Sequence, residues 1–186
     1  MSGRVIAVLG ISGVGKTTMV SAFTQRHPWA HSVRASALLK EASAVSDTEA
    51  LRTASASDIH ANQDRLTSAF SELRRRHPNR HIIFDGHSLI DNDDRLVIVP
   101  TTTFVQLAPD MIVFLEDDEN AILARRLADV GRVRPHRSAD EIAVHQNAAK
   151  EAAFEYASAL SISCATVHSE DFQAFEESLL ANFQQP

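Results

Sequence analysis

The sequence contains one cysteine, Cys164, so no disulfide can form within the chain, and nothing in it indicates an oxidising compartment. Long apolar runs are also missing. Every apolar segment is much shorter than the ~20 residues that a membrane-spanning helix requires, and the N-terminus lacks the charged-then-apolar pattern of a secretion signal. We therefore expect a cytoplasmic protein that does not associate with membranes.

Basic charge is scarce as well. Lys and Arg together number 18 against 24 Asp and Glu, which gives a net charge of −6. A protein that coats nucleic acid needs the opposite balance, so we expect a small-molecule partner and no nucleic acid. Fifteen of the 18 basic residues are Arg, whose planar fork suits bidentate capture of phosphate, although a genome rich in G and C would produce the same bias.

The residues that are present suffice for one domain over 1–186, because 44% are hydrophobic and no linker or long repeat interrupts the chain. Apolar runs such as RVIAVL at 4–9 do not alternate with polar residues, which is typical of a strand covered on both faces in a parallel sheet. Strands and helices alternate, which predicts an α/β layered fold. The predicted strands are 4–9, 31–35, 81–85, 111–116 and 161–168, and the predicted helices are about 15–26, 58–76, 119–129, 139–160 and 170–183.

The run LGISGVGKTT follows the first predicted strand and matches the G-x-x-x-x-G-K-[ST] pattern of a phosphate-binding loop. Glycines let the backbone turn with positive φ and bring successive N–H groups around a phosphate. Lys16 is expected to reach the β- and γ-phosphates of ATP, and Thr17 to hold Mg²⁺ through its hydroxyl. The residues predicted to bind the triphosphate are Gly10, Ser12, Gly13, Val14, Gly15, Lys16, Thr17 and Thr18.

The segment FDGHS ends the third predicted strand. Asp85 stands at the carboxyl end of that strand, beside the expected loop, so we predict that it is the second Mg²⁺-site residue, acting through water. His87 has two open interpretations: it contacts the acceptor, or it is a polar loop residue. No N-K-x-D motif follows, which argues against a GTPase, so a kinase is the better interpretation.

A small kinase needs a mobile, Arg-rich cover, because phosphoryl transfer depends on positioning and charge neutralisation while water is excluded. RRLADVGRVRPHR at 125–137 has five arginines in 13 residues and could close over the phosphates. A solvated surface segment is the alternative interpretation.

Several smaller features have simpler interpretations. RHPWAH at 26–31 and RHPNRH at 76–81 predict helix ends followed by strands, with metal binding by their paired histidines as the alternative. EDDEN at 116–120 predicts a helix N-terminus, again with a metal site as the alternative. Cys164 lies in an apolar strand and is expected to be buried and unreactive.

The ordered set of motifs resembles the archaeal-type adenylate kinases, a compact branch of the nucleoside monophosphate kinases. The shared landmarks are GISGVGKTT, DGHS after a buried strand, a single Pro100, APDMIVFLE leading into a helix, RRLAD followed by RVR, HQ at 145–146, and a late ATV strand before a C-terminal helix.

This resemblance implies a five-stranded parallel sheet wrapped by helices on both faces, an acceptor-binding helical segment at about 36–76 and a short Arg-rich lid at about 129–140. It places Arg126 near the donor adenine and Arg132 and Arg134 on its phosphates. Arg52 would bind the acceptor phosphate. Ser36, in VRAS where the family tends to have NFG, and His87 complete the candidate acceptor side. Family members are often oligomers, so a homotrimer or homodimer is plausible.

The departures from the family all lie near the acceptor side, whereas the donor side is nearly intact. The leading hypothesis is transfer of the γ-phosphoryl group of Mg-ATP to AMP or a related (deoxy)nucleoside monophosphate. A second hypothesis has a nucleoside or another small alcohol as acceptor, with Asp85 or His87 as the base. A third is a non-catalytic ATP-binding regulatory or assembly protein.

Overall fold

The computed structural model describes residues 2–43, 56–93, 95–131 and 134–183. Its strands are β1 (Val5–Leu9), β2 (Ala30–Arg34), β3 (His81–Asp85), β4 (Leu89–Asp91), β5 (Leu96–Ile98), β6 (Met111–Glu116) and β7 (Ser163–His168). Its helices are α1 (Lys16–Arg26), α2 (Ala35–Ser43), α4 (Ala56–Arg76), α5 (Thr101–Leu107), α6 (Glu119–Ala128), α7 (Ala139–Leu160) and α8 (Phe172–Phe183). Within the described ranges, no helix is both long and apolar enough to cross a bilayer.

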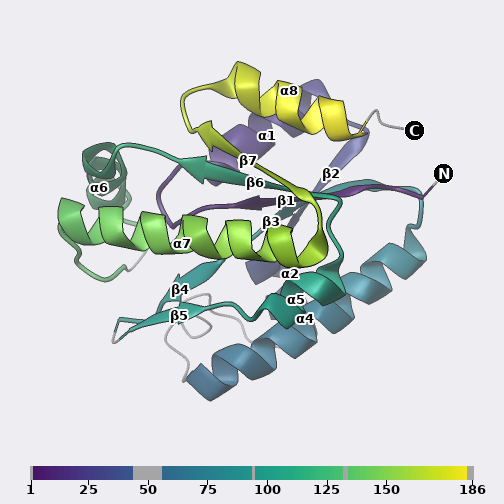
Figure 1. Ribbon diagram of the computed structural model, residues 1–186, viewed down its shortest axis with the longest axis horizontal. Coiled ribbons are helices and arrows are strands. Elements are labelled where there is room, and N and C mark those ends of the chain that lie inside the picture. Colours follow the sequence, from purple (N-terminus) through teal and green to yellow (C-terminus); the bar gives the residue numbers. More distant parts are fainter. Residues whose placement is uncertain (1, 44–55, 94, 132–133, 184–186) are drawn as a thin grey trace.

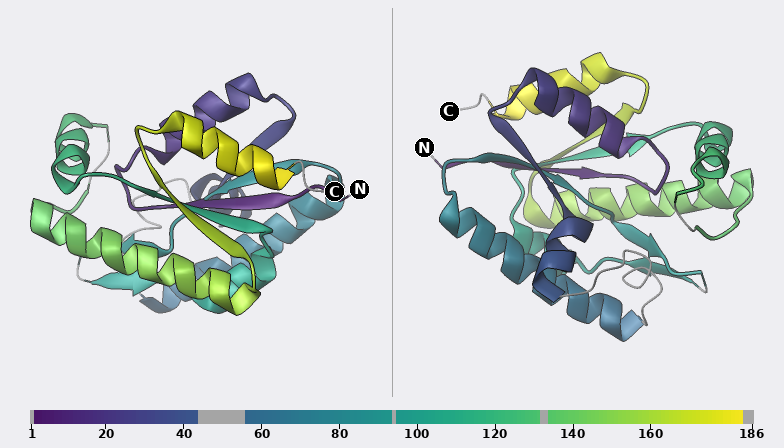
Figure 2. Two further views of the ribbon diagram at one scale, coloured as in Figure 1. Left: turned by 45° about the horizontal axis from the view of Figure 1, so that its top comes forward. Right: turned by 180° about the vertical axis from the view of Figure 1, so that it is seen from behind.

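Five parallel strands form the main sheet, in the order β2-β3-β1-β6-β7. Strand β1 lies at the centre, and all five of its residues are buried because both of its faces are covered. Helices α1 and α8 cover one face, and α7 lies across the other together with α2, α4 and α5 (Figures 1 and 2). The predicted five-stranded parallel sheet with helices on both faces is confirmed.

Residues 89–98, where no strand was predicted, fold into the antiparallel hairpin β4–β5. The hairpin is joined to α7 by hydrogen bonds. The hydroxyl of Tyr156 donates to the carbonyl oxygen of Val99 at 2.5 Å. The hydroxyl of Ser88 donates to the carbonyl oxygen of Ala149 at 2.7 Å. These bonds fix the hairpin beside the carboxyl edge of the main sheet, next to the predicted site.

Both predicted helix ends at the histidine-proline junctions are confirmed, since α1 ends at Arg26 and α4 at Arg76. After the first junction, the His27 ring contacts Glu176 of α8, with Nε2 2.9 Å from the carboxylate. After the second, Nδ1 of His81 accepts a hydrogen bond from the backbone N–H of Arg4 at 3.2 Å. The first ring therefore joins the end of α1 to α8, and the second joins β3 to the residue before β1.

Candidate active site

The phosphate-binding loop connects β1 to α1 at the carboxyl edge of the sheet. Its glycines adopt positive φ angles, 150° at Gly10 and 87° at Gly13. A Cβ at Gly10 would lie 2.7 Å from the carbonyl oxygen of Leu115, and a Cβ at Gly13 would lie 2.9 Å from Cγ of Arg126. Glycine is therefore required at both positions, at the first because the loop passes against β6 and at the second because α6 packs on it.

Lys16 is the first residue of α1, and its ammonium group folds back over the loop. Nζ donates to the carbonyl oxygens of Gly10 at 2.6 Å and Ile11 at 3.2 Å. Nδ1 of His87 lies 2.8 Å from the same Gly10 oxygen and 3.4 Å from the Lys16 Nζ. Because a carbonyl oxygen only accepts, Nδ1 carries the ring proton, and Nε2 of a neutral His87 is then an acceptor. The structure thus brings Lys16 and His87 together at the loop.

Two arginines from the Arg-rich segment at 125–137 also converge on the loop, both at Ser12. Nε of Arg126 donates to the Ser12 carbonyl oxygen at 2.9 Å, and Nε of Arg134 donates to the Ser12 hydroxyl at 3.1 Å. Burial lowers the pKa of Arg126, and repulsion from Arg134 and Arg137 adds to this effect, although Asp91 opposes it. Arg132 lies outside the described residues.

Arg134 carries a nitrogen whose hydrogen-bonding capacity is unused. Its side chain is 11% exposed, and Nη2 pairs with the carboxylate of Asp129 at 2.5 Å. Nη1 is buried and has no hydrogen-bond partner among the residues that the structure describes. A buried guanidinium N–H without a partner is costly, so this nitrogen indicates a site for an anion beside the loop.

The residues predicted to hold Mg²⁺ lie at the same edge of the sheet. Thr17 and the neighbouring Thr18 are exposed on the first turn of α1. Asp85 ends β3 and is paired with Val8 of β1, which places it one strand away from the loop. Its carboxylate is 3.9 Å from Nε of Arg34. Asp85 is therefore close to the loop, and its role toward the metal stays a prediction.

A cavity of about 600 Å³ opens beside the loop, between α2, α4, α5, the hairpin and the side of the site that Arg126 and Arg134 line. Apolar side chains such as Leu39, Leu66 and Phe104 form much of its wall. Ser12, Arg126 and Arg134 line the end next to the phosphate loop. Ser36 and His87, both predicted to bind the acceptor, line the cavity too, whereas Arg52 lies outside the described residues. Other polar lining residues are Asn62, Gln63, Asp91, Thr103 and His145.

Asp91 connects the hairpin to the segment that precedes α7. Nε and Nη2 of Arg137 donate to its two carboxylate oxygens at 3.1 and 2.9 Å, and Nδ1 of His145 is 3.6 Å away. Burial opposes ionisation of Asp91, but the hydrogen bonds and charge of Arg137 outweigh it and lower its pKa. Burial also lowers the pKa of His145, since the adjacent Asp91 only partly offsets it.

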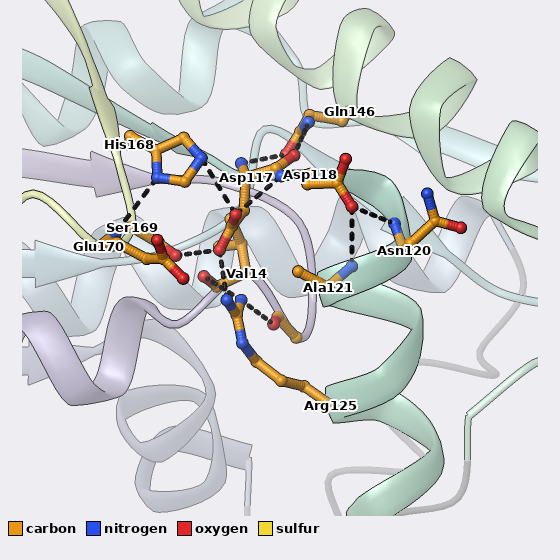
Figure 3. Close-up of polar contacts among 11 residues, drawn as sticks. Val14, Asp117, Asp118, Asn120, Ala121, Arg125, Gln146, His168, Ser169 and Glu170 are labelled. Carbon is orange, nitrogen blue, oxygen red and sulfur yellow. Dashed lines mark hydrogen bonds and ion pairs between the residues drawn. The ribbon is translucent and has the colours of Figure 1, made fainter.

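A second polar network lies on the opposite side of the loop (Figure 3). Its centre is Asp117, the residue after β6, whose side chain is only 2% exposed. The carboxylate accepts hydrogen bonds from the guanidinium of Arg125 and the hydroxyl of Ser169, and it lies 3.1 Å from Nε2 of His168. Arg125 also donates to the carbonyl oxygen of Val14 at 3.1 Å, which joins the network to the phosphate loop.

Sequence reasoning did not identify several of these residues. Asn62 and Gln63 lie within a helical pattern that does not distinguish a buried amide from an exposed one. His145 was noted only as half of HQ, and Asp117 only as part of an acidic run. Arg137 is 46 residues away from Asp91 in the chain, and the partners Arg125 and Ser169 are 8 and 52 residues away from Asp117. A signal existed for Arg125 and Arg137, which both belong to the Arg-rich segment.

A parallel sheet with a glycine loop between β1 and α1, arginines converging on that loop and a cavity beside it defines a P-loop kinase. A family model described as an AAA domain matches residues 9–143. The adenylate kinase of Methanothermobacter thermautotrophicus is 28% identical over 158 residues, which cover 83% of this chain and 84% of that protein. The adenylate kinase of Methanoculleus marisnigri is 28% identical over 189 residues, covering 92% and 93%.

Among solved structures, the tunicamycin resistance protein of Deinococcus radiodurans superposes with a TM-score of 0.63 at 12% identity, over 99% of this chain and 97% of that one. At this identity, the likeness shows the fold alone. The family match covers most of the chain, and the chain therefore belongs to the AAA-domain family of P-loop proteins. It is an ATP-dependent kinase.

Proposed function

We propose that the protein transfers the γ-phosphoryl group of Mg-ATP to a nucleoside monophosphate, with AMP as the first candidate. The observation that carries this proposal is the buried Nη1 of Arg134, next to Ser12 of the phosphate loop, for which the described residues supply no hydrogen-bond partner. Arg126 lines the same end of the cavity and experiences repulsion from Arg134. A polyphosphate would offset that repulsion and supply an acceptor to Nη1. The archaeal adenylate kinase relatives support AMP as the acceptor.

The residues around the loop fit a Mg²⁺ ion that is bound to a polyphosphate, which is the form that kinases use. Within the described part of the chain, no group of three or more His, Cys, Asp and Glu side chains could hold a metal. Mg²⁺ on a polyphosphate takes most of its ligands from phosphate and water, so it does not need such a group. The Thr17 hydroxyl would complete its shell, and the Asp85 carboxylate would hold the ion through water. When bound, the ion would neutralise phosphate charge during transfer.

The chain itself would then hold and orient the reactants. The loop amides would bind the phosphates, while Lys16, Arg126 and Arg134 would neutralise the charge on the transferring group. An acceptor phosphate in the cavity would attack in line and needs no strong base. Arg132 and Arg52 keep their predicted roles on the donor and acceptor phosphates as proposals. The lid and acceptor-segment boundaries, the cytoplasmic location and the homo-oligomer likewise stay predictions.

A hydroxyl acceptor is the second candidate, and the position of His87 favours it. His87 lies where the loop meets the cavity, and Nδ1 hydrogen-bonds Gly10. Nε2 could therefore accept the proton of an acceptor hydroxyl as its oxygen bonds to the γ-phosphorus and the bridging P–O bond to ADP breaks. His87→Gln would then lower kcat strongly with an alcohol acceptor, but little with a nucleoside monophosphate.

The test is a panel that measures ADP release from Mg-ATP with each ribo- and deoxynucleoside monophosphate, and with nucleosides and other small alcohols. We expect turnover with AMP or a related monophosphate, and we expect Lys16→Ala to abolish it while the variant remains folded. Turnover only with alcohols would favour the second candidate. ATP binding without turnover on any acceptor would favour the non-catalytic alternative, which a pull-down of a partner protein would support.

A further inference from the structure

Arg125 and Arg126 are consecutive on α6, and their side chains hold different parts of the phosphate loop. Arg126 reaches Ser12 from the cavity side. Arg125 reaches the loop from the other side, where Nη1 lies 3.4 Å from the carbonyl oxygen of Gly13 and 3.1 Å from that of Val14. Arg125 is not among the residues that line the cavity. Arg126 therefore contacts the loop from the cavity, whereas Arg125 contacts it from the side away from the cavity.

The contacts of Arg125 determine which way two peptide groups of the loop face. A trans peptide is planar, and its C=O and N–H point in opposite directions. With the carbonyls of Gly13 and Val14 directed at Arg125, the N–H groups of Val14 and Gly15 face away from it. The Val14 N–H makes a long contact of 3.4 Å with the carbonyl oxygen of Ile11, inside the loop. In a loop of this type, backbone N–H groups that face inward bind phosphate. Arg125 thus contacts the loop on the side opposite its anion-binding face.

Asp117 fixes Arg125 in this position and neutralises its charge. The carboxylate binds Nη2 of Arg125, and Figure 3 shows the guanidinium between Asp117 and Val14. Asp117 is held in turn by Gln146 of α7, which accepts from its backbone N–H at 3.1 Å and donates to its carbonyl oxygen at 2.8 Å. Burial opposes ionisation of Asp117, but hydrogen bonds from Ser169 and Arg125 lower its pKa. Because Asp117 neutralises the charge of Arg125, the effect of this guanidinium on the phosphate loop comes from the positions of its hydrogen bonds and not from net charge.

We infer that Arg125, anchored by Asp117, is a positioning residue that holds the phosphate loop in its anion-binding conformation without touching the nucleotide phosphates. Ser169 belongs to the same unit. Its hydroxyl binds Asp117, and its Cβ would be only 3.4 Å from a Cβ placed on Gly15, so the β7–α8 loop packs against the phosphate loop. This inference rests on the proposed function, because it assumes that the loop binds a polyphosphate.

The substitution Asp117→Asn distinguishes two roles of Arg125, because a positioning arginine and a phosphate-binding arginine predict different changes in the affinity for Mg-ATP. Asp117→Asn removes the charge of the carboxylate but keeps an oxygen that can accept from Arg125. If Arg125 positions the loop, the weaker anchor lowers affinity for Mg-ATP, by about 3- to 10-fold. If Arg125 bound phosphate directly, removal of the competing carboxylate would leave affinity equal or tighter.

The experiment measures binding of Mg-ATP and of magnesium tripolyphosphate by calorimetry, together with the KM values for ATP and for the acceptor. We expect Arg125→Ala to weaken both ligands by about 10- to 100-fold and to raise the ATP KM with little change in the acceptor KM. Arg125→Lys, which keeps the charge but not the planar fork, should recover only part of the loss. Arg75→Ala is the matched control, since Arg75 is an exposed, paired arginine on α4.

Thermal melting separates positioning from unfolding, and each variant is compared only where it melts as one cooperative transition well above the assay temperature. Should Arg125→Ala prove too unstable, Asp117→Asn and Arg125→Lys carry the test alone. Unchanged affinity in these folded variants, or tighter binding by Asp117→Asn, would overturn the inference and leave the proposed function intact. Wild-type protein that binds neither Mg-ATP nor tripolyphosphate would overturn the proposed function itself.

Discussion

Replacement of Arg137 by alanine should weaken acceptor binding while ATP binding stays nearly constant. Arg137 immediately precedes Ser138, the N-cap of α7, and holds the hairpin β4–β5 through both carboxylate oxygens of Asp91. It also donates to the carbonyl oxygen of Asp93 at 2.8 Å. Asp91 and its neighbours Leu89 and Ile90 line the cavity. Loss of the guanidinium therefore loosens the cavity wall, not the phosphate loop.

The magnitude follows from the shielding of this pair. The Arg137 and Asp91 side chains are 19% and 16% exposed, so solvent screens them less than a surface pair. A two-point, charge-assisted contact of this kind contributes about 1–3 kcal/mol. In a chain of this size, that loss lowers the melting temperature by about 3–8 °C. If the loosened wall weakens the acceptor complex by about 1–1.4 kcal/mol, the acceptor KM rises about 5- to 10-fold.

The assay is steady-state ADP release, with ATP and the best acceptor of the wild-type enzyme varied in turn. Arg137→Lys keeps the charge without the two-point contact and should give an intermediate acceptor KM. Arg75→Ala removes an exposed arginine whose partner Glu72 also binds Arg76, and it should change neither KM. The reasoning is refuted if both KM values rise equally, or if the acceptor KM stays constant while the melting temperature falls as expected.

Two further predictions concern titrating groups. Because burial lowers the pKa of His145, the unfolded chain binds more protons than the folded one just below pH 6.5, and the free energy of unfolding should fall as the pH drops from 7 to 5. In urea titrations, His145→Gln should show a shallower fall. Equal dependence on pH in the variant and the wild type would contradict the assignment. Burial raises the pKa of Cys164 to about 11, so this thiol should react with a disulfide reagent about 100-fold more slowly in the native protein than in urea, and equal rates would show that it is accessible and ionised.

The main sheet and the phosphate loop could be predicted because their signals are local. Apolar runs mark the buried strands β1, β3 and β6. The loop is encoded within a single run of residues that fits between β1 and α1. The strand at 31–35 was the weakest of the five predicted, and the structure has it at Ala30–Arg34. Its alternating burial reflects its place at the edge of the sheet.

The hairpin could not be predicted in the same way. Leu89–Asp91 and Leu96–Ile98 are only three residues each, too short for a periodic pattern. The turn between them includes Asp93 with a φ of 76°, an angle that nothing in the composition requires. The hairpin is held by Arg137, which is 46 residues away from Asp91 in the chain. No local pattern can encode a contact between residues so far apart in the chain.

The acidic run after β6 shows a second reason why the sequence could not predict the whole site. Asp118 does cap α6, as the predicted helix N-terminus requires, accepting from the backbone N–H groups of Asn120 and Ala121. Asp117, one residue earlier, is directed into the structure and binds Arg125. Two adjacent carboxylates at the end of a strand can point in opposite directions, and composition cannot tell which one is buried. The neighbouring elements decide it, here α7 through Gln146.

The two arginines at the end of α6 suggest why the phosphate loop does not rely on its ligand for its shape. Arg126 binds the carbonyl oxygen of Ser12, and Arg125 binds those of Gly13 and Val14, so one turn of helix holds three consecutive carbonyls. With these oxygens held outside, little backbone reorganisation remains when an anion enters. The cost of ordering the loop is then met during folding, by α6 and the Asp117 network, and not by the binding energy of the nucleotide.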